Sequence, residues 1–142
     1  MFAATEQKII DRLREVLGPS ITIEPLRELE RVPELRQKAP AAFVIYDGFK
    51  IGQSTANGQV QQIVQEWFVV VATRSARGSG DPNAARDQAA TISEQVLGAL
   101  LGYHLGGGSY LRLADAPGPE YDAGYCHVPL AFSSAATFKG QQ

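Results

Sequence analysis

The adjacent pair Cys126-His127 places the only thiol of the sequence beside an imidazole, and a second histidine, His104, lies some distance upstream. These residue types could bind a metal ion or form a thiol nucleophile. Adjacent residues of a strand point to opposite faces, however, so Cys126 and His127 could not both ligate one ion from a regular strand. We therefore predict a buried core cysteine, an exposed histidine, and no metal site here.

Other segments that resemble reactive sites lack essential parts. Gly78-Ser79-Gly80 precedes a predicted helix and could offer backbone donors to a phosphate. However, Asp81 puts a carboxylate where the anion would bind, and Pro82 removes a donor, so we predict a loop with Asp81 as the helix N-cap. Ser109 lies beside glycines but lacks the G-x-S-x-G pattern of a hydrolase serine. The sequence therefore predicts no catalytic residues, no cofactor and no enzymatic activity.

Composition also restricts the function. The chain has 142 residues, a length typical of a single domain, which we expect to span 1–142. Its 13 lysines and arginines are balanced by 15 acidic residues, for a net charge of −2, which argues against a nucleic-acid-binding module. A single cysteine allows no internal disulfide, and neither a signal peptide nor a membrane span is apparent. We expect a soluble protein made in the cytoplasm.

The first half of the chain predicts a helix and several strands. Helical spacing indicates an amphipathic helix at 6–17, with Thr5 as its N-cap, and a short edge strand follows at 21–23. The proline-rich stretch 25–40 is expected to cover one side of a sheet as a loop with a helical turn. An apolar strand at 41–46 then ends in a turn at Asp47-Gly48.

A hairpin with an exposed tip is predicted for 49–73. Its first strand, 49–55, is the weaker one, and Asn57-Gly58 supplies the turn because both residues tolerate positive φ. The second strand runs from Gln61 to Thr73 and is apolar on both faces from Trp67 onward, which is typical of a strand covered above and below.

The second half of the chain predicts one helix and two strands. The helix, 84–101, carries its apolar side chains on one stripe and ends at Gly102. A short strand at 110–113 and a final strand at 125–132 follow, and Pro129 should restrict the final strand to pairing on one side. We predict that 133–142 is a flexible tail. The fold class is α/β (α+β), with a mixed, mostly antiparallel sheet packed by two main helices.

The order of these segments resembles a known family. Gln65-Glu66-Trp67-Phe68-Val69-Val70-Val71, the loop 74–81, the helix 84–101, Gly102 and the closing segment 121–132 are similar to the small tail-terminator or tail-completion proteins of long-tailed phages. The similarity is greatest to the minor tail proteins of Mu-like phages and prophages. It implies a homohexameric ring that caps the tail tube and joins it to the head, and it implies no enzymatic activity.

The resemblance also implies partners and a location. The partners would be further copies of the chain, the tail tube and the head-tail connector proteins, with no membrane and no specific nucleic acid, although DNA could pass through the ring. The protein would assemble in the host cytoplasm and remain in the virion tail. The sequence shows no strongly acidic face that could line a DNA channel, so we do not predict which surface of the subunit faces the channel of the ring.

From exposure and position we predict six subunit contacts. They lie on the hairpin and on the loop that follows it: Lys50, Gln53, Asn57, Gln61, Arg74 and Arg77. The alternative function is a small-molecule-binding or enzymatic α/β domain with a pocket near the Gly106-Gly107-Gly108 loop.

Overall fold

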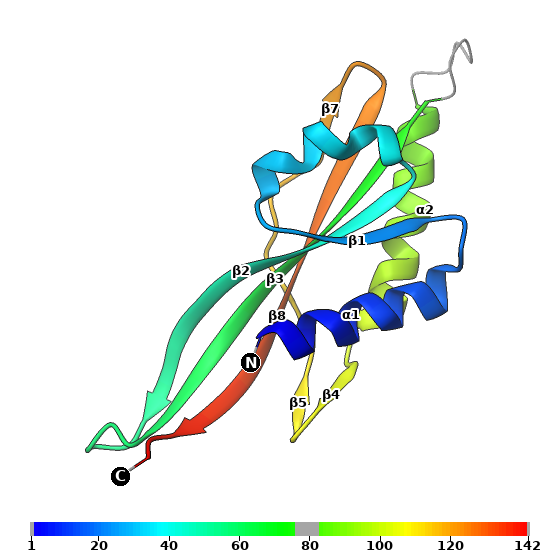
Figure 1. Ribbon diagram of the computed structural model, residues 1–142. Coiled ribbons are helices and arrows are strands. Elements are labelled where there is room, and N and C mark those ends of the chain that lie inside the picture. The colour runs from blue at the N-terminus through cyan, green and yellow to red at the C-terminus, as the bar shows by residue number, and fades with distance from the viewer. Residues whose placement is uncertain (1, 76–82, 142) are drawn as a thin grey trace.

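The computed structural model describes residues 2–75 and 83–141, and its centre is a twisted sheet with helices on both faces (Figure 1). The elements follow in the order α1 (Phe2–Leu17), β1 (Thr22–Leu26), the 3-10 helix η1 (Leu29–Lys38), β2 (Ala41–Ser54), β3 (Val60–Arg74), α2 (Ala84–Leu100), β4 (His104–Gly106), β5 (Ser109–Tyr110), β6 (Arg112–Ala114), β7 (Glu120–Asp122) and β8 (Tyr125–Lys139).

The main sheet has the strand order β1-β2-β3-β8-β6, and β7 also pairs with β8. β1 runs parallel to β2 at the edge, and every other pair in this sheet is antiparallel. The predicted mixed, mostly antiparallel sheet packed by helices is therefore confirmed. Pro129 also behaves as predicted: the outer edge of β8 pairs with β7 and then β6, and no described strand pairs there with residues 128–130.

Alternate residues of the central strands enter two separate cores. Val69 and Val71 of β3 face α1 and α2, whereas Val70 between them faces η1. All three are at most 1% exposed. The apolar run that begins at Trp67 is thus explained, because a strand buried on both faces needs no polar alternation.

The two main helices are joined by basic side chains of α1 that reach the C-terminal end of α2. Arg12 Nε donates to the carbonyl of Ala99 in the last turn of α2 at 3.1 Å, and Lys8 Nζ donates to the carbonyl of Leu105 in β4. Helix C-terminal carbonyls lack intrahelical donors, so cations are favourable at this position. α1 packs over β1 and β2, while α2 packs over β3 and β8 (Figure 1).

Three strands continue past the helices as a projecting ribbon, at the lower left of Figure 1. We call this ribbon the arm and define it as residues 47–54 of β2, 60–66 of β3 and 133–139 of β8. The rest of the domain is called the body. The arm is the predicted exposed hairpin with a third strand added.

The third strand corrects the prediction for the C-terminal segment. The last strand was predicted to end at Phe132, with 133–142 as a flexible tail, but β8 continues to Lys139 and pairs with β3 without a register shift. This segment has too little apolar surface to order alone. Its backbone is instead paired along β3, from Glu66 to Val60.

Two other predicted boundaries are wrong. Asp47-Gly48 does not turn the chain, because β2 continues through it with a bulge at Asp47 and a φ of 96° at Gly48. Helix α1 begins at Phe2 rather than after Thr5, and stacking of Phe2 on Tyr46 gives its first turn a tertiary contact. The predicted cap Asp81 and Pro82 lie outside the described residues, which resume at Asn83, just before α2.

Candidate subunit interface

The tip of the arm is closed by hydrogen bonds around Asn57. Its side-chain oxygen accepts from Thr55 Oγ1 at 2.8 Å and from the backbone N–H of Gln59 at 3.1 Å. Gly58 has a φ of 72°, a conformation that costs glycine little. The predicted Asn57-Gly58 turn is therefore correct, and Asn57 contributes to it through its own side chain.

Gln61 holds an irregularity in the first strand of the arm. β2 shifts register between Ile51 and Ser54, and the amide of Gln61 donates to the carbonyls of Gly52 and Gln53, both at 3.2 Å. A bulge leaves carbonyls without ladder partners, and this side chain satisfies two of them. Its amide is therefore already used within the arm, although Gln61 was predicted as a contact between copies.

Lys50 lies on one face of the arm in an ion pair with Glu66, with 3.1 Å between Nζ and Oε1. The lysine side chain is 75% exposed, so the pair contributes only about 0–1 kcal/mol of stability. Partial burial of the Asp47 carboxyl, followed by repulsion from Glu66 and Glu30, raises its pKa, and Lys50 opposes this shift. This face of the arm is therefore polar.

The predicted contact residues do not form one group. Lys50, Gln53, Asn57 and Gln61 all lie on the arm, whereas Arg74 is the last residue of β3, at the other end of that strand. At about 3.3 Å per residue, Gln61 and Arg74 are separated by roughly 40 Å along β3. Arg77 lies outside the described residues. The role of all six residues as contacts between copies stays a prediction.

The opposite face of the arm carries exposed apolar side chains that the sequence analysis missed. Phe49 and Ile51 of β2 are 54% and 78% exposed, and Phe138 of β8 is 44% exposed. The register places Ile51 opposite Ile63 of the central strand, and places Phe138 opposite Gln61, two residues along the same face. The alternation in Phe49-Lys50-Ile51 was a signal for this face, whereas Phe138 was hidden in the presumed tail.

Aromatic rings and polar groups are buried together at the root of the arm. Tyr46 lies between Phe2 and Trp67, with ring centroids 4.7 Å apart in both contacts. Two residues from Trp67 toward the tip, Gln65 of β3 lies opposite Ser134 of β8. Gln65 Oε1 and Ser134 Oγ are buried and have no hydrogen-bond partner among the described residues. Such burial costs about 1–3 kcal/mol per group, so these two groups destabilise the root of the arm.

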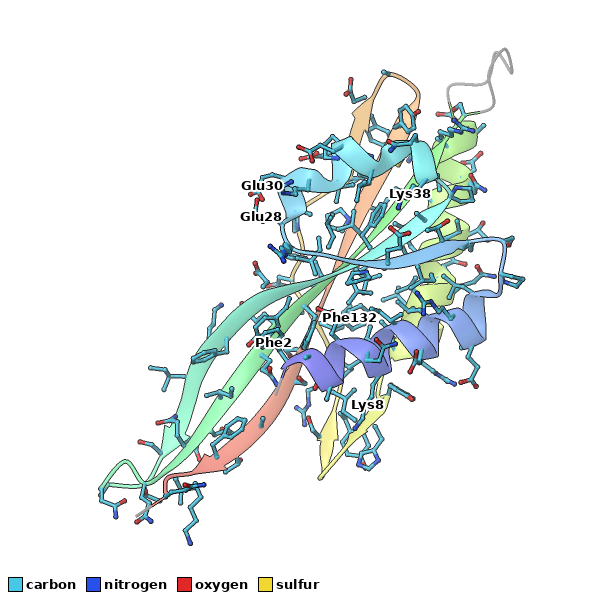
Figure 2. All side chains as sticks on the ribbon, in the orientation of Figure 1. Phe2, Lys8, Glu28, Glu30, Lys38 and Phe132 are labelled. Carbon is cyan, nitrogen blue, oxygen red and sulfur yellow. The ribbon has the colours of Figure 1, made fainter. Side chains whose placement is uncertain are left out.

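A hollow of about 810 Å³ opens beside this root, where β1 ends and leaves the edge of β2 uncovered. Figure 2 shows Phe2 on one side of this region and Glu28 at the start of η1 on the other. The residues that line the hollow are Phe2, Glu6, Pro25, Leu26, Arg27, Glu28, Arg31 and Tyr46. Partial burial raises the pKa of Glu6.

The Gly106-Gly107-Gly108 loop, where the alternative function placed a pocket, is the tip of the small β4-β5 hairpin. Gly106, Gly107 and Gly108 all have positive φ and are exposed. None of them lines the hollow at the arm root, and this hairpin lies apart from that hollow.

Cys126 and His127 point to opposite faces of β8, as predicted. Cys126 is buried beneath the helices, and burial raises the pKa of its thiol, against smaller opposing effects of Arg86 and Tyr121. His127 was predicted to be exposed, but it is only 6% exposed because η1 lies over its face of the sheet and β7 pairs beside it. No group of three or more His, Cys, Asp or Glu side chains placed to hold a metal ion occurs among residues 2–75 and 83–141.

A comparison with protein families identifies the family of this chain. The family model described as phage tail terminator protein matches residues 1–142, the whole chain. The chain belongs to the phage tail terminator family. Its members have a structural role in phage tails, which confirms the predicted family and the coarser part of the predicted function.

Two further findings concern this tail terminator family member, one from a comparison with curated sequences and one from its helices. No curated protein sequence matches the chain. Within the part of the chain that the structure describes, no helix has both the length and the apolar character needed to cross a membrane.

Proposed function

We propose that this tail terminator family member assembles into a homo-oligomeric ring, expected to be a hexamer, that ends the tail tube and joins it to the head. Family membership supports the place in the tail. The observation that carries the ring is the arm, since it extends past the helices and exposes Phe49, Ile51 and Phe138 on one face. Exposed apolar patches of this kind mark surfaces that bind another protein.

A ring requires two different surfaces on each subunit. When unlike patches of identical subunits bind head to tail, the contact repeats around a closed circle. Each subunit provides unlike surfaces, because the arm has one edge on β2 and the other on β8, and its thin ribbon differs from the helix-covered sheet of the body. The same asymmetry suits a ring that meets a tube on one side and a head connector on the other.

The proposed role is structural and needs no catalytic residues or cofactor. The partners are further copies of the chain, the tail tube and the connector, and DNA passes through the ring without sequence-specific contacts. Assembly takes place in the host cytoplasm before the ring becomes part of the virion tail.

The proposal is tested with a phage or prophage that encodes this chain. Deletion of the gene should give tails without a finished upper end and heads without tails in electron micrographs. Purified protein should then bind to one end of isolated tubes as a ring, with a mass of about six chains by native mass spectrometry, six being the family expectation. Normal virions from the deletion strain would refute the proposal.

A further inference from the structure

Both outer strands of the arm have an uncovered edge, and these edges belong to different strands. β1 pairs with β2 only along residues 41–45, so no described strand covers β2 from Tyr46 to Ser54. On the other side, β6 pairs with β8 along residues 131–133 and Ser109 of β5 binds the carbonyl of Ala135, which leaves 136–139 uncovered by any described strand. Uncovered edges present backbone donors and acceptors to other chains.

The two edges run in the same direction. β2 and β8 are each antiparallel to β3, so both proceed from the body toward the tip of the arm. Arms of two copies that point the same way can therefore lie side by side, with β8 of one copy parallel to β2 of the next.

The backbone of β8 is oriented to make this contact. The carbonyl of Ala135 accepts from Ser109 Oγ at 2.7 Å, on the outer side of β8, whereas the N–H of Gly140 donates inward to the carbonyl of Gln59 at 2.7 Å. Successive residues of a strand alternate in direction. Thr137 and Lys139 therefore point their backbone groups outward, and the edge contains neither a bulge nor a proline.

The side chains complement the same contact. The exposed apolar residues of the arm belong to the outer strands, Phe49 and Ile51 on β2 and Phe138 on β8, and all three occupy one face. Side-by-side arms would bring Phe138 of one copy toward Phe49 and Ile51 of the next. The arm has two acidic and two basic residues, so its charges cancel and copies do not repel one another: Asp47, Glu66, Lys50 and Lys139.

We propose that the outer edge of β8 (residues 136–139) pairs in parallel with the outer edge of β2 (from Tyr46) in the next copy, so that the arms form one continuous sheet around the ring. We call this contact between neighbouring arms the seam. It specifies how copies meet within the proposed ring and therefore rests on the proposed function. It is a head-to-tail contact, as a closed ring requires. Strand addition at an open edge supplies the affinity through backbone hydrogen bonds, and the apolar row supplies the specificity.

A mixing experiment tests which edges meet. Lys50→Cys and Thr137→Cys are prepared as separate proteins, since both side chains lie on the polar face of the arm and the natural Cys126 is buried. Under mild oxidation of assembled rings, the mixture should give disulfide-linked dimers, whereas each variant alone should not. Dimers from Thr137→Cys alone would indicate a symmetric pairing of two β8 edges and overturn the proposal, as would rings without any cross-link.

A second pair of variants tests the backbone contact. Thr137→Pro removes an outward N–H and leaves the inward bonds to β3 in place, while Thr137→Ala removes the side chain and keeps the N–H. Thr137→Pro should assemble about tenfold more weakly at each seam, and Thr137→Ala should assemble normally. Circular dichroism of the unassembled protein verifies that both variants fold.

The two proposals fail in different ways. If Thr137→Pro forms rings as well as the unmodified chain, or restores normal tails to the deletion strain, the seam is wrong and the ring remains. If the unmodified chain forms no ring on isolated tubes, the proposed function itself fails. An arm edge occupied by a segment of the tube protein would give rings without Cys–Cys cross-links between copies, which also overturns the seam.

Discussion

The strands β2, β3 and β8 run through both the body and the arm, yet their side chains have different surroundings in the two regions. In the body, Val44 of β2 is fully buried beneath the helices. Seven residues later in the same strand, Ile51 is 78% exposed although it also faces an apolar neighbour on β3. The difference is the cover, because α1, α2 and η1 end before the arm begins (Figure 1). Strand pairing continues past the point where the helices bury it, and this extra length is the part of the chain to which we assign the proposed contacts between copies.

The largest effect that separates the two regions is expected from truncating one phenylalanine in each. Phe43→Ala removes a fully buried ring beneath η1 and should lower the free energy of unfolding by about 3–5 kcal/mol. Phe49→Ala, in the same strand, removes a ring that is already 54% exposed and should cost less than about 1 kcal/mol. Urea denaturation of the unassembled protein measures both values.

Equal losses from the two phenylalanine variants would contradict the comparison. Such a result would mean that the arm is covered in solution by contacts within the chain. A large loss for Phe49→Ala that appears only at high protein concentration would instead support contacts between copies, since association stabilises the folded state by mass action.

A buried hydrogen bond gives the next largest difference. Thr73 Oγ1 donates to the carbonyl of Ala85 at 2.6 Å and fixes the end of β3 to the start of α2. Thr73→Val keeps the shape and should cost about 1–2 kcal/mol because the buried bond is lost. Thr55→Val removes the exposed bond to Asn57 at the arm tip and should cost about 0.5 kcal/mol. A larger loss at Thr55 in thermal unfolding would refute this order.

The same glycine substitution should have opposite signs in the two regions. Gly58 at the arm tip has a φ of 72°, so Gly58→Ala should destabilise the protein by about 1 kcal/mol. Gly98 lies in α2 with open space around it, and Gly98→Ala should stabilise the protein by roughly 0.5–1 kcal/mol. Differential scanning calorimetry should show melting temperatures on opposite sides of the unmodified protein. Two shifts of the same sign would show that one of these backbone conformations is misplaced.

The body could be predicted from the sequence because its signals are local. Helical spacing in α2 and the two-sided apolar run from Trp67 each indicate their own conformation, and the same is true of the turn at Asn57-Gly58 at the arm tip. Each of these elements needs tertiary packing to be stable, but its sequence pattern can be identified without knowledge of that packing. Pro129 could be interpreted in the same way, since the missing donor restricts pairing wherever the strand lies.

The arm could be predicted only in part, because its third strand depends on a partner far along the chain. Nothing within 133–139 indicates a strand, and its order comes from pairing with residues 60–66. His127 was misplaced for a related reason: its burial depends on η1, which the sequence suggested only as a loop with a helical turn. Phe138 was not predicted to belong to an apolar face because 133–142 was predicted to be a flexible tail.

The smallest expected effect concerns the charge at the root of the arm. Partial burial and repulsion by Glu66 and Glu30 raise the pKa of Asp47 above its ordinary value of 3.8. An acid with a raised pKa in the folded state binds its proton more tightly there, so this contribution to stability is present below pH 3.8 and is lost as pH rises through the raised pKa.

Asp47→Asn mimics the protonated acid and should therefore be more stable than the unmodified chain at pH 7, with the difference shrinking toward pH 3. Melting temperatures at the two pH values measure it, and Asp115→Asn at an exposed site of the body serves as the control. The effect should be small because Asp47 is largely open to water, which screens its neighbours. If the stabilisation by Asp47→Asn were greater at pH 3 than at pH 7, attraction to Lys50 would dominate at Asp47, and the arm root would not be a site of excess negative charge.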